Sequence, residues 1–124
     1  MVERATRKIL AVHVCEGKRH DKKLLKDSRV RLKKETKAVL DSGYQGAQHD
    51  HANTDLPHKR SKKKPLTKEQ KRANTALARV RIANEHVIGS VKRFKIVAER
   101  YRNRRKRYGL RMTLIAAIHN MELI

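Results

Sequence analysis

Residues 81–94 are the stretch around which the chain is organised: Arg81-Ile82-Ala83-Asn84-Glu85-His86-Val87-Ile88-Gly89-Ser90-Val91-Lys92-Arg93-Phe94. At about 100° per residue, Arg81, Glu85 and Lys92 fall within roughly 40° of one another on a helix. A second, apolar face about a third of a turn away carries Val80, Val87, Val91 and Phe94. The stretch predicts an amphipathic helix with one carboxylate between two cations beside its core face. Such an acid can bind a metal ion next to a phosphate, although a surface ion pair at i, i+4 is the simpler interpretation.

Composition and charge point to a polyanionic partner. The chain has 124 residues, enough for one small domain, with 38% hydrophobic and 3% aromatic residues, so its own core should be thin. Its net charge is +21, and residues 57–124 hold 20 Lys/Arg against 4 Asp/Glu. This imbalance favours nucleic acid as the partner. A membrane is disfavoured because there is no apolar run near 18 residues and no amphipathic helix with a bulky aromatic face.

Cysteine usage and the N-terminus indicate a cytoplasmic protein. The one cysteine, Cys15, excludes a disulfide framework within the chain and is expected to be a small buried hydrophobe. The N-terminus lacks the apolar core of a signal peptide.

The first half of the chain predicts a strand, a helix and a second strand. Residues 7–15 are expected to form the first strand, and the absence of a preceding element to pair with it is a first indication of missing sequence. Asp21 is expected to cap a helix over residues 22–34. The second strand, residues 37–41, ends at Asp41 before the glycine-containing turn 42–46. Parallel α/β folds place their chemistry at such strand ends, whereas an ordinary turn aspartate is the alternative.

The second half is predicted to be mainly helical. Residues 47–66 form a polar loop whose Lys62, Lys63 and Lys64 either contact phosphate or are solvated; a zinc site at His49 and His51 is disfavoured because further ligands are missing. Thr67-Lys68-Glu69-Gln70 is a capping box that should start a helix reaching about residue 96, with a break considered at 74–75. The basic segment 100–107 follows. A C-terminal packing helix is then expected to bury Leu110, Leu114, Ile118 and Met121.

Asp41 and Glu85 are two of the acids that a two-metal phosphoryl-transfer site requires. Such a site needs a bridging carboxylate and a further one for each ion. In the ribonuclease-H-like arrangement the third acid stands on an earlier strand, and Glu3, Glu16 and Asp21 are not placed to supply it.

Several motifs together resemble the C-terminal part of the catalytic domain of DDE-type insertion-sequence transposases. They are Gly17-x-x-His20-Asp21, Asp41-Ser42-Gly43-Tyr44-Gln45-Gly46, the Lys-rich loop through Glu69, Glu85-His86-Val87-Ile88 and the basic segment 100–107. The family signature Tyr-x2-Arg-x3-Glu-x6-Lys matches at Arg81, Glu85 and Lys92, whereas its tyrosine position is Ala78.

The resemblance implies an α/β, partial ribonuclease-H-like fold with two or three strands, a long catalytic helix and a C-terminal packing helix. It describes residues 1–124 as an incomplete catalytic domain, with a strand-helix-strand part at 1–46, a basic loop at 47–66 and a helical part at 67–124. Asp41 and Glu85 would be the second and third acids of the triad and would bind Mg²⁺ or Mn²⁺. The implied DNA-binding residues are Arg81, Lys92, Arg93, Arg102, Arg104, Arg105, Lys106, Arg107, Lys62, Lys63 and Lys64.

The resemblance also implies DNA transposition in the bacterial cytoplasm, in association with the nucleoid, with element ends and target DNA as partners. Because the first acid is missing, the isolated chain is expected to have little or no cleavage activity, and the missing N-terminal portion or a second copy becomes a further candidate partner. Two alternatives stay open. One is a non-enzymatic basic nucleic-acid-binding protein of the ribosomal or nucleoid type; the other is a domesticated nuclease-like protein with a changed role.

Overall fold

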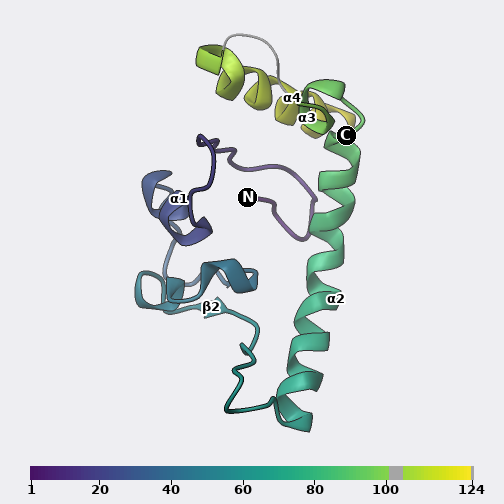
Figure 1. Cartoon of the computed structure of the whole chain (residues 1–124). Coiled ribbons are helices and arrows are strands. Elements are labelled where there is room, and N and C mark those ends of the chain that lie inside the picture. The colour runs from purple at the N-terminus through teal and green to yellow at the C-terminus, as the bar shows by residue number, and fades with distance from the viewer. Residues whose placement is uncertain (101–104, 124) are drawn as a thin grey trace. The chain divides into compact units, whose positions relative to one another are not determined.

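The structure, a computed structural model, describes residues 1–100 and 105–123, which divide into two compact units. One unit combines residues 1–15 with 82–124, and the other comprises residues 16–81. Their elements are α1 (Asp21–Asp27), β1 (Ala38–Val39), β2 (Thr54–Asp55), α2 (Lys68–Val91), α3 (Lys95–Ala98) and α4 (Tyr108–Glu122) (Figure 1). Short 3₁₀ turns occupy Ser42–Tyr44, Ala47–His49 and Arg105–Arg107. Among the described residues, no helix combines the length and apolar character needed to cross a membrane.

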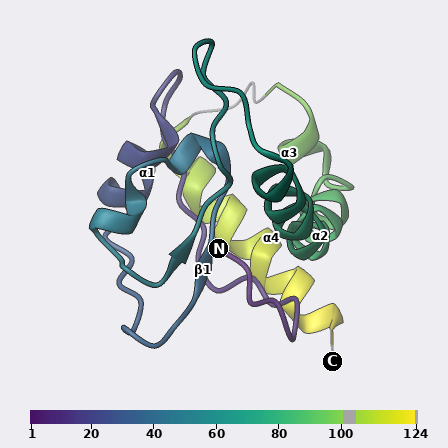
Figure 2. The same ribbon diagram turned by 90° about the horizontal axis from the view of Figure 1, so that it is seen from below.

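The unit of residues 16–81 contains a two-stranded parallel sheet. Ala38 faces Thr54 and Val39 faces Asp55, and the Leu40 N–H donates to the Asp55 carbonyl at 3.0 Å. The strand predicted at 37–41 is confirmed at its centre, where Figure 2 labels β1. The prediction that 47–66 is entirely loop is wrong, because β2 lies inside it. Two polar residues such as Thr54 and Asp55 give no alternating pattern from which so short a strand could be predicted.

Helix α1 is shorter than predicted and begins differently. It ends at Asp27, where the Ser28 N–H donates to the Leu24 carbonyl at 3.0 Å, and the chain then turns through a positive φ at Arg29. The cap is His20, whose Nδ1 accepts from the Lys22 N–H at 3.3 Å. The prediction that Asp21 caps a helix over 22–34 is therefore wrong. Asp21 is instead the first helical residue, where a carboxylate interacts favourably with the helix dipole.

Helix α2 starts at the predicted capping box. The Gln70 N–H donates to the Thr67 hydroxyl at 3.2 Å, and the Thr67 N–H donates to the Gln70 side-chain oxygen at 3.0 Å. The helix runs without a break through residues 74–75 to Val91, a length of about 36 Å at 1.5 Å per residue (Figure 1). It stops short of residue 96 because the chain turns at 92–94 before α3.

The apolar face predicted for α2 is the face that is buried. Val87 and Val91 are buried, whereas Val80 and Phe94 are half-buried. Among the described residues of the unit 1–15 and 82–124, the other buried ones belong to α4: Ile115, Ala116 and His119. Figure 2 labels this helix.

The prediction of which face of the C-terminal helix is buried is wrong. Leu110, Leu114, Ile118 and Met121 are 42–71% exposed, and the opposite side of α4 is buried. His119 can be buried on that side because both of its ring nitrogens have partners. Nδ1 contacts the Ser90 hydroxyl and Nε2 contacts the Arg7 carbonyl, each at 3.3 Å. A satisfied polar ring can replace an apolar side chain at low cost, and hydrophobic spacing alone does not reveal it.

Residues 7–15 do not form the predicted strand. Their sole ladder contact within the described chain is an isolated antiparallel bridge between Val2 and Ile9. Asn120 takes the place of a neighbouring strand: Ile9 donates its N–H to Asn120 Oδ1 at 2.7 Å, and Asn120 Nδ2 donates to the Ile9 carbonyl at 2.8 Å. A strand requires a continuous backbone partner, and this side chain satisfies one residue. Cys15, predicted to be buried, is exposed.

Candidate functional site

Asp41 lies at the carboxyl end of the parallel sheet and caps the turn that follows. Its Oδ1 accepts the Ser42 N–H at 2.7 Å, and its carbonyl accepts the Tyr44 N–H at 3.0 Å. The position is the strand-end location predicted from sequence, and the capping role expected of an ordinary turn aspartate is present as well. The Asp41 side chain is 63% exposed, so its carboxylate remains accessible to a ligand.

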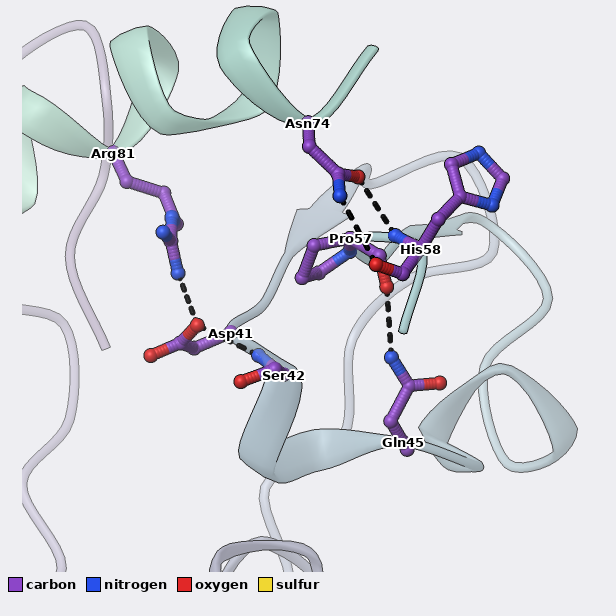
Figure 3. A network of polar contacts seen from close by, with 7 residues as sticks. All are labelled: Asp41, Ser42, Gln45, Pro57, His58, Asn74 and Arg81. Atoms are coloured by element: carbon purple, nitrogen blue, oxygen red, sulfur yellow. Dashed lines mark hydrogen bonds and ion pairs between the residues drawn. The ribbon is translucent and has the colours of Figure 1, made fainter. Parts of the chain in front are cut away.

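Arg81 of α2 makes an ion pair with Asp41 inside the same unit. Figure 3 shows the guanidinium pointing at the carboxylate, with Nη1 against Oδ1. The Ser42 N–H and then the Arg81 guanidinium hold the pKa of Asp41 below its ordinary value of 3.8. The carboxylate is therefore ionised throughout the neutral range, as a metal ligand must be.

The turn after Asp41 is tied to the segment that follows β2. Gln45 Nε2 donates to the Pro57 carbonyl at 2.8 Å, and Asn74 of α2 clasps the backbone of His58 (Figure 3). In that clasp the His58 N–H donates to Asn74 Oδ1 at 2.7 Å, and Asn74 Nδ2 donates to the His58 carbonyl at 3.0 Å. These two links and the Arg81 ion pair connect the Asp41 turn, residues 57–58 and the part of α2 between Asn74 and Arg81.

Two carboxylates near this turn affect the pKa of the Tyr44 phenol. Burial is the main cause that raises its pKa above the ordinary value of 10.0, and the charges of Asp21 and Asp41 add to it. Asp21 therefore lies close to the predicted site, although sequence analysis assigned it to helix capping alone.

The signature residues of α2 do not form the predicted pattern of an acid between two cations. Arg81 pairs with Asp41, and Glu85 is exposed one helical turn further along, with no ion pair in the described part of the chain. Lys92 is exposed just after α2, where its N–H still donates to the Ile88 carbonyl at 3.0 Å. The i, i+4 surface ion pair considered as the alternative is likewise absent between Arg81 and Glu85.

The predicted DNA-binding cations that the structure describes are on the surface. Lys62, Lys63 and Lys64 are exposed in a turn closed by hydrogen bonds between Ser61 and Lys64, and Lys106 and Arg107 are exposed before α4. Arg93 pairs with Glu122 and lies over the Phe94 ring, 4.9 Å from its centre. Arg102 and Arg104 are outside the described residues, and Arg105 belongs to a 3₁₀ turn.

Asp41 fits a divalent cation as one ligand. Carboxylate oxygen is the donor that Mg²⁺ and Mn²⁺ prefer, and Mg²⁺ commonly keeps several waters while binding one or two carboxylates. Oδ1 accepts the Ser42 N–H and pairs with the Arg81 guanidinium, and the side chain as a whole stays 63% exposed. The described residues contain no cluster of three or more His, Cys, Asp or Glu side chains able to hold a metal, so they supply no complete cage.

Comparison with known proteins identifies the family. The model of the DDE superfamily endonuclease family matches residues 2–120. The chain belongs to that family. It is also 42% identical over 123 residues to a protein described as a probable transposase for insertion sequence element IS702 of Microchaete diplosiphon. That match covers 99% of this DDE-family chain and 45% of the relative, so the chain spans less than half of the relative's length. No solved structure matches this chain.

Sequence reasoning missed four contributors to the candidate site around Asp41: Asp21, Gln45, Asn74 and the short strand β2. Asp21 and Gln45 both belong to motifs that carried the family resemblance, which was a signal that they do more than cap or fill a turn. Asn74 is a polar residue inside a long helix, where it is an unfavourable choice unless its side chain has a partner. Nothing in the sequence singles out the partner, the backbone of His58.

Proposed function

We propose that this chain is part of a metal-dependent DNA strand-transfer enzyme with a ribonuclease-H-like catalytic fold. The observation that carries the proposal is Asp41, which stands ionised and accessible at the carboxyl end of a parallel strand in a chain of the DDE family. In this proposal Asp41 and Glu85 bind Mg²⁺ or Mn²⁺. A bound ion of this kind supplies Lewis-acid activation of a phosphodiester and of the attacking oxygen.

The chain's own residues would then bind and orient DNA. Arg81 offers a planar fork that fits a phosphate once it leaves Asp41, whereas Lys92 offers a point charge. The exposed cations of the 62–64 turn and of residues 106–107 would contact the sugar-phosphate backbone of element ends and target without reading bases. Binding should therefore weaken steeply as salt increases, since each neutralised phosphate releases counterions.

Cleavage is proposed to require a further carboxylate from outside this sequence. Support comes from the lack of a three-acid cluster in the described residues and from the 45% share of the transposase relative that the chain spans. The full chain, incubated with element-end DNA and Mn²⁺, should produce no nicks. Efficient nicking that Glu85→Gln abolishes would show that the chain is self-sufficient and would refute this part of the proposal.

A second candidate is a non-enzymatic DNA- or RNA-binding protein, favoured by the net charge of +21. The two functions differ in their response to metal. The strand-transfer lineage predicts that Mn²⁺ strengthens binding to a DNA duplex, because the ion occupies Asp41 and leaves Arg81 to bind phosphate. This effect should disappear in Asp41→Asn, measured by fluorescence anisotropy at constant ionic strength. Equal binding with and without Mn²⁺ would favour the purely electrostatic binder.

A further inference from the structure

The carboxylate of Asp21 occupies the space beside Gly43 that a larger residue would need. A Cβ built on Gly43 would overlap Asp21 Oδ2 and lie 3.1 Å from its Cγ and 3.4 Å from its Cβ. All three distances are tighter than or at the limit of ordinary contact, and the aspartate side chain is short. Residue 43 must therefore be glycine for as long as Asp21 keeps this position.

The requirement at Gly43 is steric rather than conformational. Gly17 and Gly46 have positive φ values of 62° and 91°, which favour glycine whatever surrounds them, whereas Gly43 does not have a positive φ. A Cβ on Gly17 or Gly89 would meet nothing within 4 Å. A Cβ on Gly46 would meet the flexible end of Lys22. Among these glycines, Gly43 is distinguished by a neighbour that is a short acidic side chain.

Gly43 is the centre of the turn that orients Asp41. The 3₁₀ turn Ser42–Tyr44 is closed at one end by the Tyr44 N–H bond to the Asp41 carbonyl and by the Ser42 N–H bond to the Asp41 side chain. A displacement of Gly43 changes the direction of the Ser42 N–H and with it the orientation of the Asp41 carboxylate. Asp21 is held in turn by the first turn of α1, which His20 caps.

We propose that Asp21 is a positioning residue for Asp41: its side chain packs against Gly43 and keeps the Ser42–Tyr44 turn in the conformation that presents the Asp41 carboxylate. The proposal rests on the proposed function in one respect, namely that Asp41 binds a divalent metal. The packing of α1 against the turn is independent of that function and is tested separately.

A double-mutant cycle on the full chain tests the packing. Gly43→Ala should lower the melting temperature by a few degrees in the wild-type chain and in Asp21→Asn, which keeps the shape of the side chain. In Asp21→Ala the same substitution should cost less than half as much, because the space is then free. Asp21→Ser, which also shortens the side chain, provides a second background if Asp21→Ala does not fold. An equal penalty for Gly43→Ala in all backgrounds would refute the contact.

Two further measurements test the positioning of Asp41. The Ser42 amide resonance in a ¹H–¹⁵N spectrum should move in Asp21→Ala and stay in place in Asp27→Ala, which removes an acid from the other end of α1. The dissociation constant for Mn²⁺ should rise about tenfold in Asp21→Ala, the low end of the range for residues that orient metal ligands. It should change by no more than about twofold in Asp21→Asn, since the exposed charge is screened by salt.

The outcomes separate the two proposals. If Asp21→Asn weakens Mn²⁺ binding as strongly as Asp41→Asn does, Asp21 is itself a ligand and the positioning role is wrong. If the wild-type chain shows no Mn²⁺ binding that depends on Asp41, the proposed function fails, while the melting cycle and the Ser42 resonance still decide whether Asp21 holds the turn. An unmoved Ser42 resonance in Asp21→Ala would also contradict the positioning role.

Discussion

The guanidinium of Arg81 on α2 is paired with the carboxylate of Asp41 at the end of β1. Two residues proposed for different tasks, phosphate binding and metal binding, neutralise each other within one unit. A metal ion and Arg81 would compete for the same carboxylate. Metal binding would then release the guanidinium for a DNA phosphate.

Removing the guanidinium should therefore strengthen metal binding. Arg81→Met is expected to increase Mn²⁺ affinity by up to about fivefold, because an ion pair whose carboxylate is mostly exposed contributes about 1 kcal/mol. Asp41 stays ionised without its partner, since its ordinary pKa is 3.8. Isothermal titration calorimetry at pH 7.5 provides the measurement, and Arg79→Met, an exposed arginine of the same helix, is the matched control. Unchanged or weaker Mn²⁺ binding in Arg81→Met would contradict the competition.

The same pair should make stability depend on acid pH. The folded-state pKa of Asp41 is depressed, so its contribution is present above the unfolded value and is lost as the pH falls through the folded value. The urea midpoint of the wild-type chain should fall between pH 5 and pH 2 by more than that of Asp41→Asn. Other carboxylates titrate in both proteins, so the difference between them isolates Asp41. Parallel pH profiles would mean that the pair contributes nothing.

Asn120 is expected to hold the N-terminal segment in place. Asn120→Ala leaves the Ile9 N–H and carbonyl without their partners, at a local cost of about 1–3 kcal/mol if the groups stay unsatisfied. Hydrogen exchange at the Ile9 amide should accelerate strongly, whereas Asn84→Ala, an exposed asparagine of α2, should leave it unchanged. Asn120→Asp keeps the acceptor for the N–H and should retain part of the protection. Fast exchange at Ile9 in the wild-type chain would show that the hydrogen bonds between Asn120 and Ile9 do not form.

The reversed face of α4 predicts opposite effects for two neighbouring residues. Ile115→Ala should destabilise the chain by about 2–4 kcal/mol, because the side chain is 6% exposed and its removal leaves a cavity. Leu114→Ala should cost less than about 1 kcal/mol, because the side chain is 56% exposed. Urea unfolding of both variants gives the comparison. A larger loss of unfolding free energy in Leu114→Ala would show that the face expected from hydrophobic spacing is the buried one.

Local signals in the sequence predicted the elements that depend on local physics. The Thr67–Gln70 capping box places the start of α2, and the valine spacing identifies its buried face, because both follow from helix geometry within a few residues. The strand around Ala38 and the strand-end position of Asp41 were also predicted. The family was identified correctly from motifs alone.

The features that sequence missed depend on partners distant in the chain. Residues 7–15 have the composition of a strand, but Asn120 satisfies Ile9 instead of a neighbouring strand. His119 replaces an apolar residue in the buried face of α4 because Ser90 and Arg7 satisfy its ring. The side chain that lies beside Gly43 belongs to Asp21, on a different element. None of these pairings leaves a periodic trace in the sequence.

Direct binding of Mn²⁺ to the full chain tests the central claim, that Asp41 and Glu85 are metal ligands of a DDE-family site. The free-Mn²⁺ signal in electron paramagnetic resonance should fall as wild-type chain is added. Asp41→Asn and Glu85→Gln should each remove most of that binding, whereas Asp27→Asn, which alters an exposed acid paired with Arg19 in the same unit as Asp41, should leave it intact. Binding that survives both Asp41→Asn and Glu85→Gln would contradict the assignment.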